Sequence, residues 1–269
     1  MIKVNTHSHT TYCGHAENTM ADMVAAASQA GLDTFAITEH YPLLPPWDTW
    51  GYISLPYWKL DDYLAEIEQQ RQLHPEMTIL SGAEVDWLGE GENRDLMAQD
   101  WSVFDMSLLS VHFVDGWAFD DPAERYRWQT QGPDACWKRY FEIWIEAVCS
   151  DLPCTHMSHP DLVKKFGYWP SFDPLPLYKQ AAEACAASGR MIEVNTSGKF
   201  YACKEFFPGP DLLREFCRAG VPCTVGTDAH AAVNVDRAIE EAYAYMYEAG
   251  YRCVSVPVRG GGIREIPIE

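Results

Sequence analysis

The sequence predicts an α/β protein whose parallel strands close into a barrel. Short β-rich runs alternate along the chain with stretches of helical period, as in parallel sheets surrounded by helices. The 269 residues, 47% of them hydrophobic, can bury the core of one barrel-sized domain, which we expect to span residues 1–269. Polar residues follow strand after strand, as they do at the carboxyl-terminal mouth of such barrels.

The elements of the first half are marked by local signals. A short apolar start leads into NTHSHTTYCGH, residues 5–15. TMAD at 19–22 resembles a capping box and opens an alanine-rich helix that should stop at Gly31. The alternating run DTFAITEH then predicts a strand ending at His40. The Pro- and Trp-rich segment 41–57 has no clean period, so we expect a long loop over the barrel mouth.

The remaining elements follow the same alternation, with glycine after several helices. The expected helices span 59–73, 134–149, 174–188, 212–219 and 236–249, and the expected strands span 77–87, 104–111, 153–159, 191–195, 221–230 and 251–258. The glycines at 260–262 follow no strand-turn-helix pattern, so we interpret them as a flexible turn rather than a phosphate loop.

The stretch around His7 predicts half of a metal site. Alternate side chains of a strand point the same way, so His7 and His9 can face one centre while Ser8 faces away. Neutral imidazole suits zinc, iron, manganese or copper. An exposed loop could also carry such a pair, and the decision rests on the residues that follow the later strands.

Nine ligand-capable residues stand at or near strand ends. They are His7, His9, His15, His40, Glu84, His112, His156, Asp228 and His230. Burying so many imidazoles together would be costly unless a cation used their lone pairs. The sequence therefore predicts a metal cluster at the barrel mouth.

The composition limits the partners. With 39 acidic and 20 basic residues the formal charge is -19, which disfavours extended nucleic acid. Bound cations could still attract a small phosphorylated substrate.

The nine cysteines show no Cys-x-x-Cys spacing and are expected to be reduced. We see no signal peptide and no apolar run of membrane-spanning length, so we expect a cytoplasmic protein without membrane contact.

Taken together, the motifs HSH at 7–9, TEH at 38–40, GAEVDW at 82–87, SVHF at 110–113, THMSH at 155–159 and GTDAH at 226–230 resemble those of the polymerase and histidinol phosphatase (PHP) family. The resemblance covers essentially the whole chain. It implies a distorted, TIM-like seven-stranded (β/α) barrel holding two to three divalent metals, which could be Zn, Fe or Mn. The implied ligands are His7, His9, Glu84 and Asp228 for one metal, Glu84, His112 and His156 for a second, and His15, His40 and His230 for a third.

Within the family, the segments 110–122 and 193–198 look most like the histidinol-phosphate phosphatase branch. This implies hydrolysis of a small phosphate monoester to inorganic phosphate, with a hydroxide bridging the two metals that share Glu84 as the nucleophile. His159 and Asp161 are candidates for protonating the leaving group; a hydrogen bond to a metal ligand and a helix N-cap are the respective alternatives.

Charged and aromatic residues near the later motifs are the candidates for substrate contacts. The branch usually binds phosphate through arginines near the fifth and sixth motifs, whereas this chain has lysines there. The substrate-binding candidates are Lys164, Lys199 and Lys204 for phosphate, Glu193 for an amine, and Trp117 in the mouth loop. Glu193 could instead be structural, and Trp117 could simply pack beneath a loop.

Two other functions stay open at this point. A related phosphoesterase could act on nucleotides or short oligonucleotides, although the acidity of the chain opposes this. Alternatively, the metals could only stabilise the fold of a protein without turnover.

Overall fold

Seven parallel strands form a nearly closed barrel in the computed structural model, which describes residues 1–48 and 52–268. In spatial order they are β1 (Lys3–Asn5), β2 (Leu32–His40), β3 (Thr78–Asp86), β4 (Met106–Ser110), β7 (His156–Met157), β8 (Met191–Asn195) and β9 (Cys223–Gly226). At the seam, where β9 meets β1, the Thr6 amide donates a hydrogen bond to the Val225 carbonyl and the Asp228 amide donates one to the His7 carbonyl, both at 2.9 Å. The predicted barrel is confirmed.

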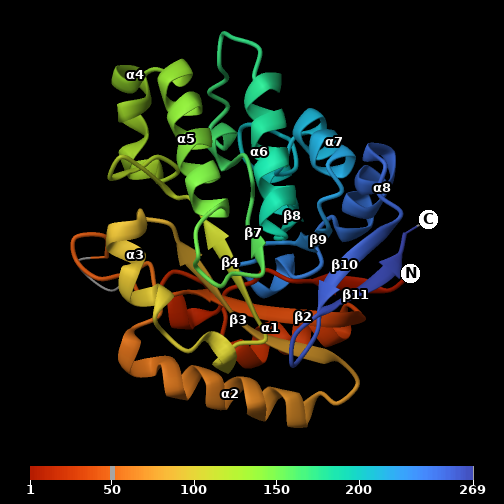
Figure 1. Cartoon of the computed structure of the whole chain (residues 1–269). Coiled ribbons are helices and arrows are strands. Elements are labelled where there is room, and N and C mark those ends of the chain that lie inside the picture. The colour runs from red at the N-terminus through yellow and green to blue at the C-terminus, as the bar shows by residue number, and fades with distance from the viewer. Residues whose placement is uncertain (49–51, 269) are drawn as a thin grey trace.

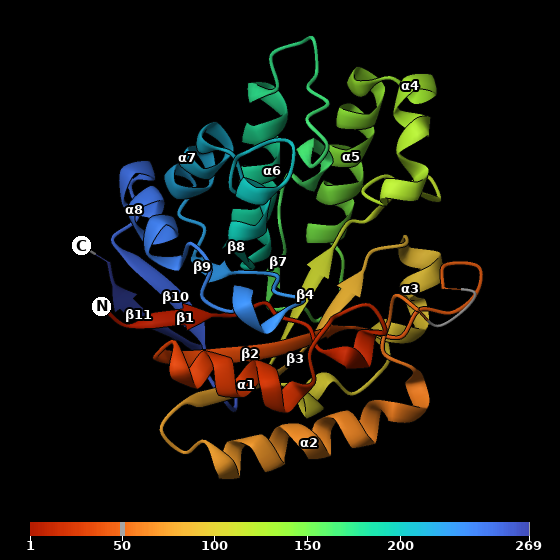
Figure 2. The ribbon, with the colours of Figure 1, turned by 180° about the vertical axis from the view of Figure 1, so that it is seen from behind.

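Helices surround the strands. They are α1 (Met20–Gln29), α2 (Leu60–Leu73), α3 (Glu90–Met97), α4 (Trp128–Gln131), α5 (Pro133–Val148), α6 (Leu175–Ser188), α7 (Pro210–Arg218) and α8 (Ile239–Ala249). In Figure 1, α1 and α2 lie on one side of the strands, and α5 to α8 lie on the other. Figure 2 shows both termini at the same edge of the molecule. None of the helices in the described ranges is long and apolar enough to span a bilayer.

Local chemistry explains where the first helix begins and ends. The Thr19 side chain accepts a hydrogen bond from the Asp22 amide, and the Asp22 carboxylate accepts one from the Thr19 amide. This reciprocal pair is the predicted capping box, with Asp in place of Glu. Gly31 follows the helix with a φ of 71°, a left-handed conformation that favours glycine.

Strand register determines which residues reach the barrel interior. Glu84 on β3 aligns with His40 on β2 and with Leu108 on β4. Below this layer, Ala36, Leu80 and Met106 pack with Leu108 in a small apolar cluster separate from the main core. Side chains two residues apart share a face, so this cluster fills the barrel beneath Glu84. The Glu84 carboxylate therefore lies above this apolar cluster and faces the mouth of the barrel.

Some predicted elements differ from the structure. The strand expected at 153–159 is reduced to His156–Met157. The last strand does not join the barrel: β10 (Cys253–Pro257) pairs antiparallel with β11 (Ile263–Pro267), and the glycines at 260–262 form the turn between them. Helix α3 and the hairpin of β5 (Phe113–Val114) and β6 (Trp117–Ala118) were not predicted. The expected loop at 41–57 is irregular over most of its described residues; positions 49–51 lie outside the described ranges.

Candidate metal centre

Four predicted ligands meet at the end of β1. The Nε2 atoms of His7 and His9 are 3.1 Å apart, and each lies 3.3 Å from Glu84 Oε2. Asp228 Oδ1 is 3.3 Å from His9 Nε2 and 3.7 Å from His7 Nε2. Asp228 follows β9 with a φ of 53°, an uncommon backbone conformation that is often found at functional sites. Two nitrogens and two carboxylates thus converge on one point.

A second group of histidines surrounds the same carboxylate. His40 Nδ1 lies 3.1 Å from Glu84 Oε2, and His112 Nε2 lies 3.6 Å from Glu84 Oε1. His159 Nε2 is 3.0 Å from Glu84 Oε1. Glu84 therefore stands between the two groups and offers each of them an oxygen, as a bridging ligand would.

A third group lies nearer the solvent. His15 Nε2 is 2.9 Å from His230 Nε2, and the ligand atoms of His15, His40 and His230 all lie within 4.8 Å of one another. The His9 ring stacks against both His40 and His230, with centroids 4.4 and 4.2 Å away, and the centroids of those two rings are 6.1 Å apart. The predicted third set is thus adjacent to the first.

The donor set fits divalent cations. Glu84 Oε2 is buried and has no hydrogen-bond partner among the described residues, although several imidazole nitrogens surround it. The Nε2 atoms of His7 and His9 are so close that their lone pairs would repel each other unless a proton or a cation lay between them. Imidazole nitrogen with carboxylate oxygen suits zinc, iron or manganese.

Without metal, protons would occupy part of this site. Burial lowers the pKa of His7, but Glu193 and Glu84 together raise it well above its ordinary value. Burial alone would raise the pKa of Glu84, but His7 and His40 hold it well below its usual range. The carboxylate is therefore ionised and available as a ligand, whereas a metal would have to displace the proton from His7.

Carboxylates behind the cluster orient two of the histidines. Glu193 Oε1 lies 2.9 Å from His7 Nδ1, and Asp86 Oδ1 lies 2.7 Å from His112 Nδ1. An Nδ1–H that donates to a carboxylate leaves Nε2 free for a metal. Asp86 was not predicted from the sequence, although its position two residues after Glu84 on the same strand face could have indicated it.

The structure departs from the sequence prediction at His156. Strand β4 separates this residue from Glu84, since both pair with Leu108 on opposite sides. Both ring nitrogens of His156 are buried without a hydrogen-bond partner in the described part of the chain. Because β7 ends early, His159 lies beyond the strand and reaches Glu84 instead.

Asp161 and Lys164 lie away from the cluster and bind each other. The two charged groups are 2.8 Å apart and fully buried. Lys164 also contacts Glu205 at 3.0 Å, and Asp161 accepts a hydrogen bond from the Gly209 amide. The expected N-cap hydrogen bond of Asp161 is not formed. This ion pair fixes the turn that follows His159, and it leaves Lys164 turned away from a substrate.

Other predicted substrate contacts are also engaged elsewhere. Lys199 pairs with Glu241, and Lys204 is exposed, with a φ of 56°. Trp117 is 1% exposed and packs edge-on against Trp128, in agreement with the packing alternative. Glu193 is fully buried behind His7, where a substrate amine would not reach it.

Lys165 is the basic side chain at the mouth. It lines a cavity of about 340 Å³ together with His15, His40 and His112. Its Nζ lies 2.9 Å from Asp120 Oδ2. Burial lowers the pKa of Lys165, but Asp120, Tyr201 and Asp228 together raise it above its ordinary value, so the ammonium stays charged. The sequence shows two adjacent lysines, and only the structure reveals which of them faces the metal centre.

Comparison with known proteins gives the family. A model described as PHP domain matches residues 5–197, which is more than half of the chain. The chain belongs to the PHP domain family. This confirms the family predicted from the metal motifs.

Two relatives match most of the chain. A "Probable histidinol-phosphatase" of Deinococcus radiodurans is 30% identical over 256 residues, 93% of this chain and 95% of the relative. A "Probable phosphatase" of Photobacterium profundum is 50% identical over 239 residues, 86% of this chain and 80% of the relative. The second name is the less specific about substrate.

A solved structure shares the fold. It is the histidinol phosphate phosphatase of Lactococcus lactis, in complex with zinc, L-histidinol and phosphate. The TM-score is 0.79 at 23% identity, with 97% of this chain and 98% of the other covered. At this identity the likeness supports the PHP-type barrel alone.

Proposed function

We propose that this chain is a metal-dependent phosphate monoesterase that hydrolyses histidinol phosphate or a close analogue. The observation that carries the proposal is Glu84, which stands between two groups of imidazoles beside the charged Lys165. The relative named for histidinol phosphatase and the zinc, histidinol and phosphate of the Lactococcus structure support the same substrate class.

The metal assignment follows the contacts. Three sets would hold metal ions: His7, His9, Glu84 and Asp228; Glu84, His40, His112 and His159; and His15, His40 and His230. We assign to His159 the ligand role that the family resemblance implied for His156, because His159 contacts Glu84. The number of ions depends on how His40 is shared, since it belongs to two sets.

Divalent ions in these sets would lower the pKa of coordinated water and offset the charge of a phosphoryl group. The residues of the chain would position the reactants. Lys165 would donate hydrogen bonds to the phosphate oxygens, with Asp120 holding the ammonium in place. Because His159 contacts Glu84 through Nε2, we assign it to metal binding rather than to protonation of the leaving group.

A substrate panel with metal analysis tests the proposal. The purified protein should contain divalent metal and release phosphate faster from histidinol phosphate than from phenyl phosphate or 3′,5′-nucleotides. Turnover of nucleotides alone would favour the nucleotide phosphoesterase. Absence of turnover with every metal would favour a structural metal site.

Histidine variants test the ligand assignment. His159→Ala should lose bound metal and most of its activity, whereas His156→Ala should retain both. His74→Ala is the matched control, because His74 lies at the end of α2 and pairs with Glu76. Equal metal content in the His159 variant and the wild type would contradict the assignment.

A further inference from the structure

We propose that a second cavity beside the metal centre binds the positively charged, nitrogen-bearing leaving group of the substrate. This inference rests on the proposed phosphatase function and names the part of the substrate that the metal centre does not bind. Glu193, the sequence candidate for an amine, is buried behind His7. A cationic substrate therefore needs another partner.

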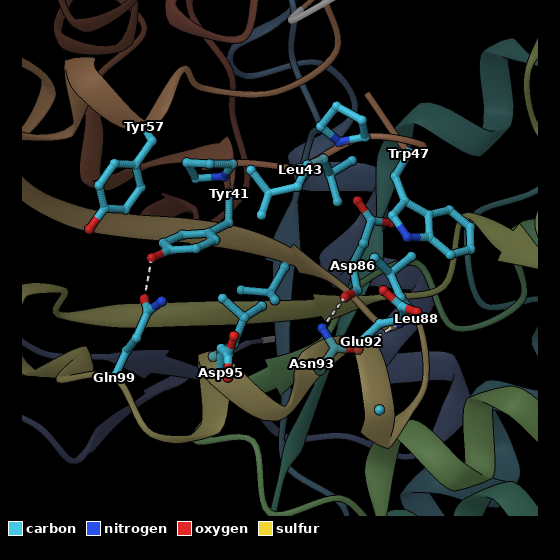
Figure 3. A pocket seen from close by; sticks show the side chains of 16 residues that line it. Tyr41, Leu43, Trp47, Tyr57, Asp86, Leu88, Glu92, Asn93, Asp95 and Gln99 are labelled. Atoms are coloured by element: carbon cyan, nitrogen blue, oxygen red, sulfur yellow. Dashed lines mark hydrogen bonds between the residues drawn. The ribbon is translucent and has the colours of Figure 1, made fainter. Parts of the chain in front are cut away.

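The cavity has a volume of about 480 Å³ and lies between the chain after β2 and helix α3. Figure 3 shows its lining from close by. Three aromatic and three acidic side chains stand out: Tyr41, Trp47, Tyr57, Asp86, Glu92 and Asp95. A volume of this size is ordinary for a small-molecule site.

This cavity adjoins the mouth of the metal centre. Leu43 and Asp86 line both cavities. Asp86 is also the carboxylate that holds His112, with Oδ1 2.7 Å from the ring nitrogen. The two cavities are thus separated at Asp86 by a single residue. A phosphate monoester that binds the metals through its phosphate would extend its leaving group past Leu43 into the second cavity.

The charge of the lining selects a cation. None of the described residues that line the cavity is Lys or Arg. Glu92 and Asp95 have no ion-pair partner within the described ranges, so their charge is free to act on a ligand. The faces of Tyr and Trp rings also attract cations. The mouth of the metal centre holds Lys165 paired with Asp120, and this ammonium together with bound divalent ions would attract the phosphate end.

Trp47 adds a directional contact. Its Nε1 is buried and has no hydrogen-bond partner in the described part of the chain. A buried donor without a partner is costly, and a ligand with an acceptor nitrogen or oxygen would satisfy it. An amine that also carries a nitrogen heterocycle offers both a cation for the carboxylates and an acceptor for the indole.

The test compares two substrates on one double variant, Glu92→Gln with Asp95→Asn. Both side chains are exposed, so the fold should persist. We expect KM for histidinol phosphate to rise about tenfold, with kcat nearly unchanged, because each lost charge contact weakens binding severalfold. KM for phenyl phosphate, which has no cation, should not change. Glu90→Gln on the same helix, outside the cavity, is the matched control.

Binding of free L-histidinol, measured by calorimetry, separates the two proposals. Weaker binding to the double variant than to the wild type supports the cavity even if neither phosphate is hydrolysed, an outcome that would refute only the phosphatase function. Equal binding to both proteins, or equal changes in KM for both substrates, overturns the cavity proposal. Trp47→Phe should weaken histidinol binding while retaining the aromatic face.

Discussion

Replacing Glu193 with glutamine should weaken metal binding by about ten- to a hundredfold without unfolding the protein. Glu193 is fully buried, and its Oε1 lies 2.9 Å from His7 Nδ1. The same oxygen accepts hydrogen bonds from the His159 amide at 3.0 Å and from Asn195 Nδ2 at 2.9 Å. One carboxylate therefore supports residues of two metal-binding sets.

The magnitude follows from what glutamine retains. Its amide oxygen can accept the two hydrogen bonds from His159 and Asn195, so mainly the charge opposite His7 is lost. A hydrogen bond to a charged group contributes about twice as much as a neutral one, a difference of roughly 1–2 kcal/mol. That difference corresponds to roughly five- to thirtyfold in affinity, which overlaps the lower part of the expected range. Alanine would instead leave these donors without an acceptor, and the fold itself would suffer.

The assay is a competition for zinc or manganese between the protein and a chromophoric chelator, followed by kcat/KM at saturating metal. Glu183→Gln on the exposed face of α6 serves as the control. If Glu193 contacted a substrate amine, the glutamine variant would keep its metal affinity and raise KM for the cationic substrate alone. That pattern, or a metal affinity within about twofold of the wild type, would refute the reasoning.

Three further predictions concern the same region. Burial lowers the pKa of His9, but Asp228 and Glu84 raise it to about 9, so without metal this side chain holds a proton at neutral pH. Because a metal must displace that proton, metal affinity should rise as the pH rises toward 9. A metal affinity that does not change with pH in titrations would contradict this prediction. Gly226→Ala would place a Cβ atom 2.3 Å from Glu193 Oε2, so we expect a lower Tm and less bound metal, and wild-type values of both would count against the packing argument. Lys164→Met would leave the carboxylate of Asp161 buried without its cation, which should cost about 3–5 kcal/mol in the free energy of unfolding measured with urea; an unchanged midpoint would exclude a role in stability.

The barrel could be predicted from the sequence because its signals are local. The capping box at Thr19 and the glycine after α1 fix one helix without reference to the rest of the chain. The alternation of strands and helices then leaves few arrangements, and strand ends bring residues as distant as His7 and Asp228 to one mouth. The single-domain extent and the cytoplasmic location stay predictions.

Other features could not be predicted because they depend on side-chain direction. His156 and His159 both stand in THMSH, and only the early end of β7 decides which one reaches Glu84. Lys164 and Lys165 are adjacent, yet one is fully buried against Asp161 and the other lines the mouth.

Helix α3 escaped prediction for a different reason. It buries Asn93 alone among its residues and so has no apolar period for a sequence analysis to detect. For the same reason, the sequence did not predict the 480 Å³ cavity that α3 lines.

The seam of the barrel joins His7 and Asp228, which are separated by more than two hundred residues and contact each other through backbone and side chain. During synthesis on the ribosome, His7 and His9 emerge long before Asp228, the carboxylate that completes their set. A cation captured early would meet only part of its final coordination shell. The first set should therefore bind its ion only after nearly the entire polypeptide has left the ribosome. The bound ion would then link the first and the last strand of the barrel.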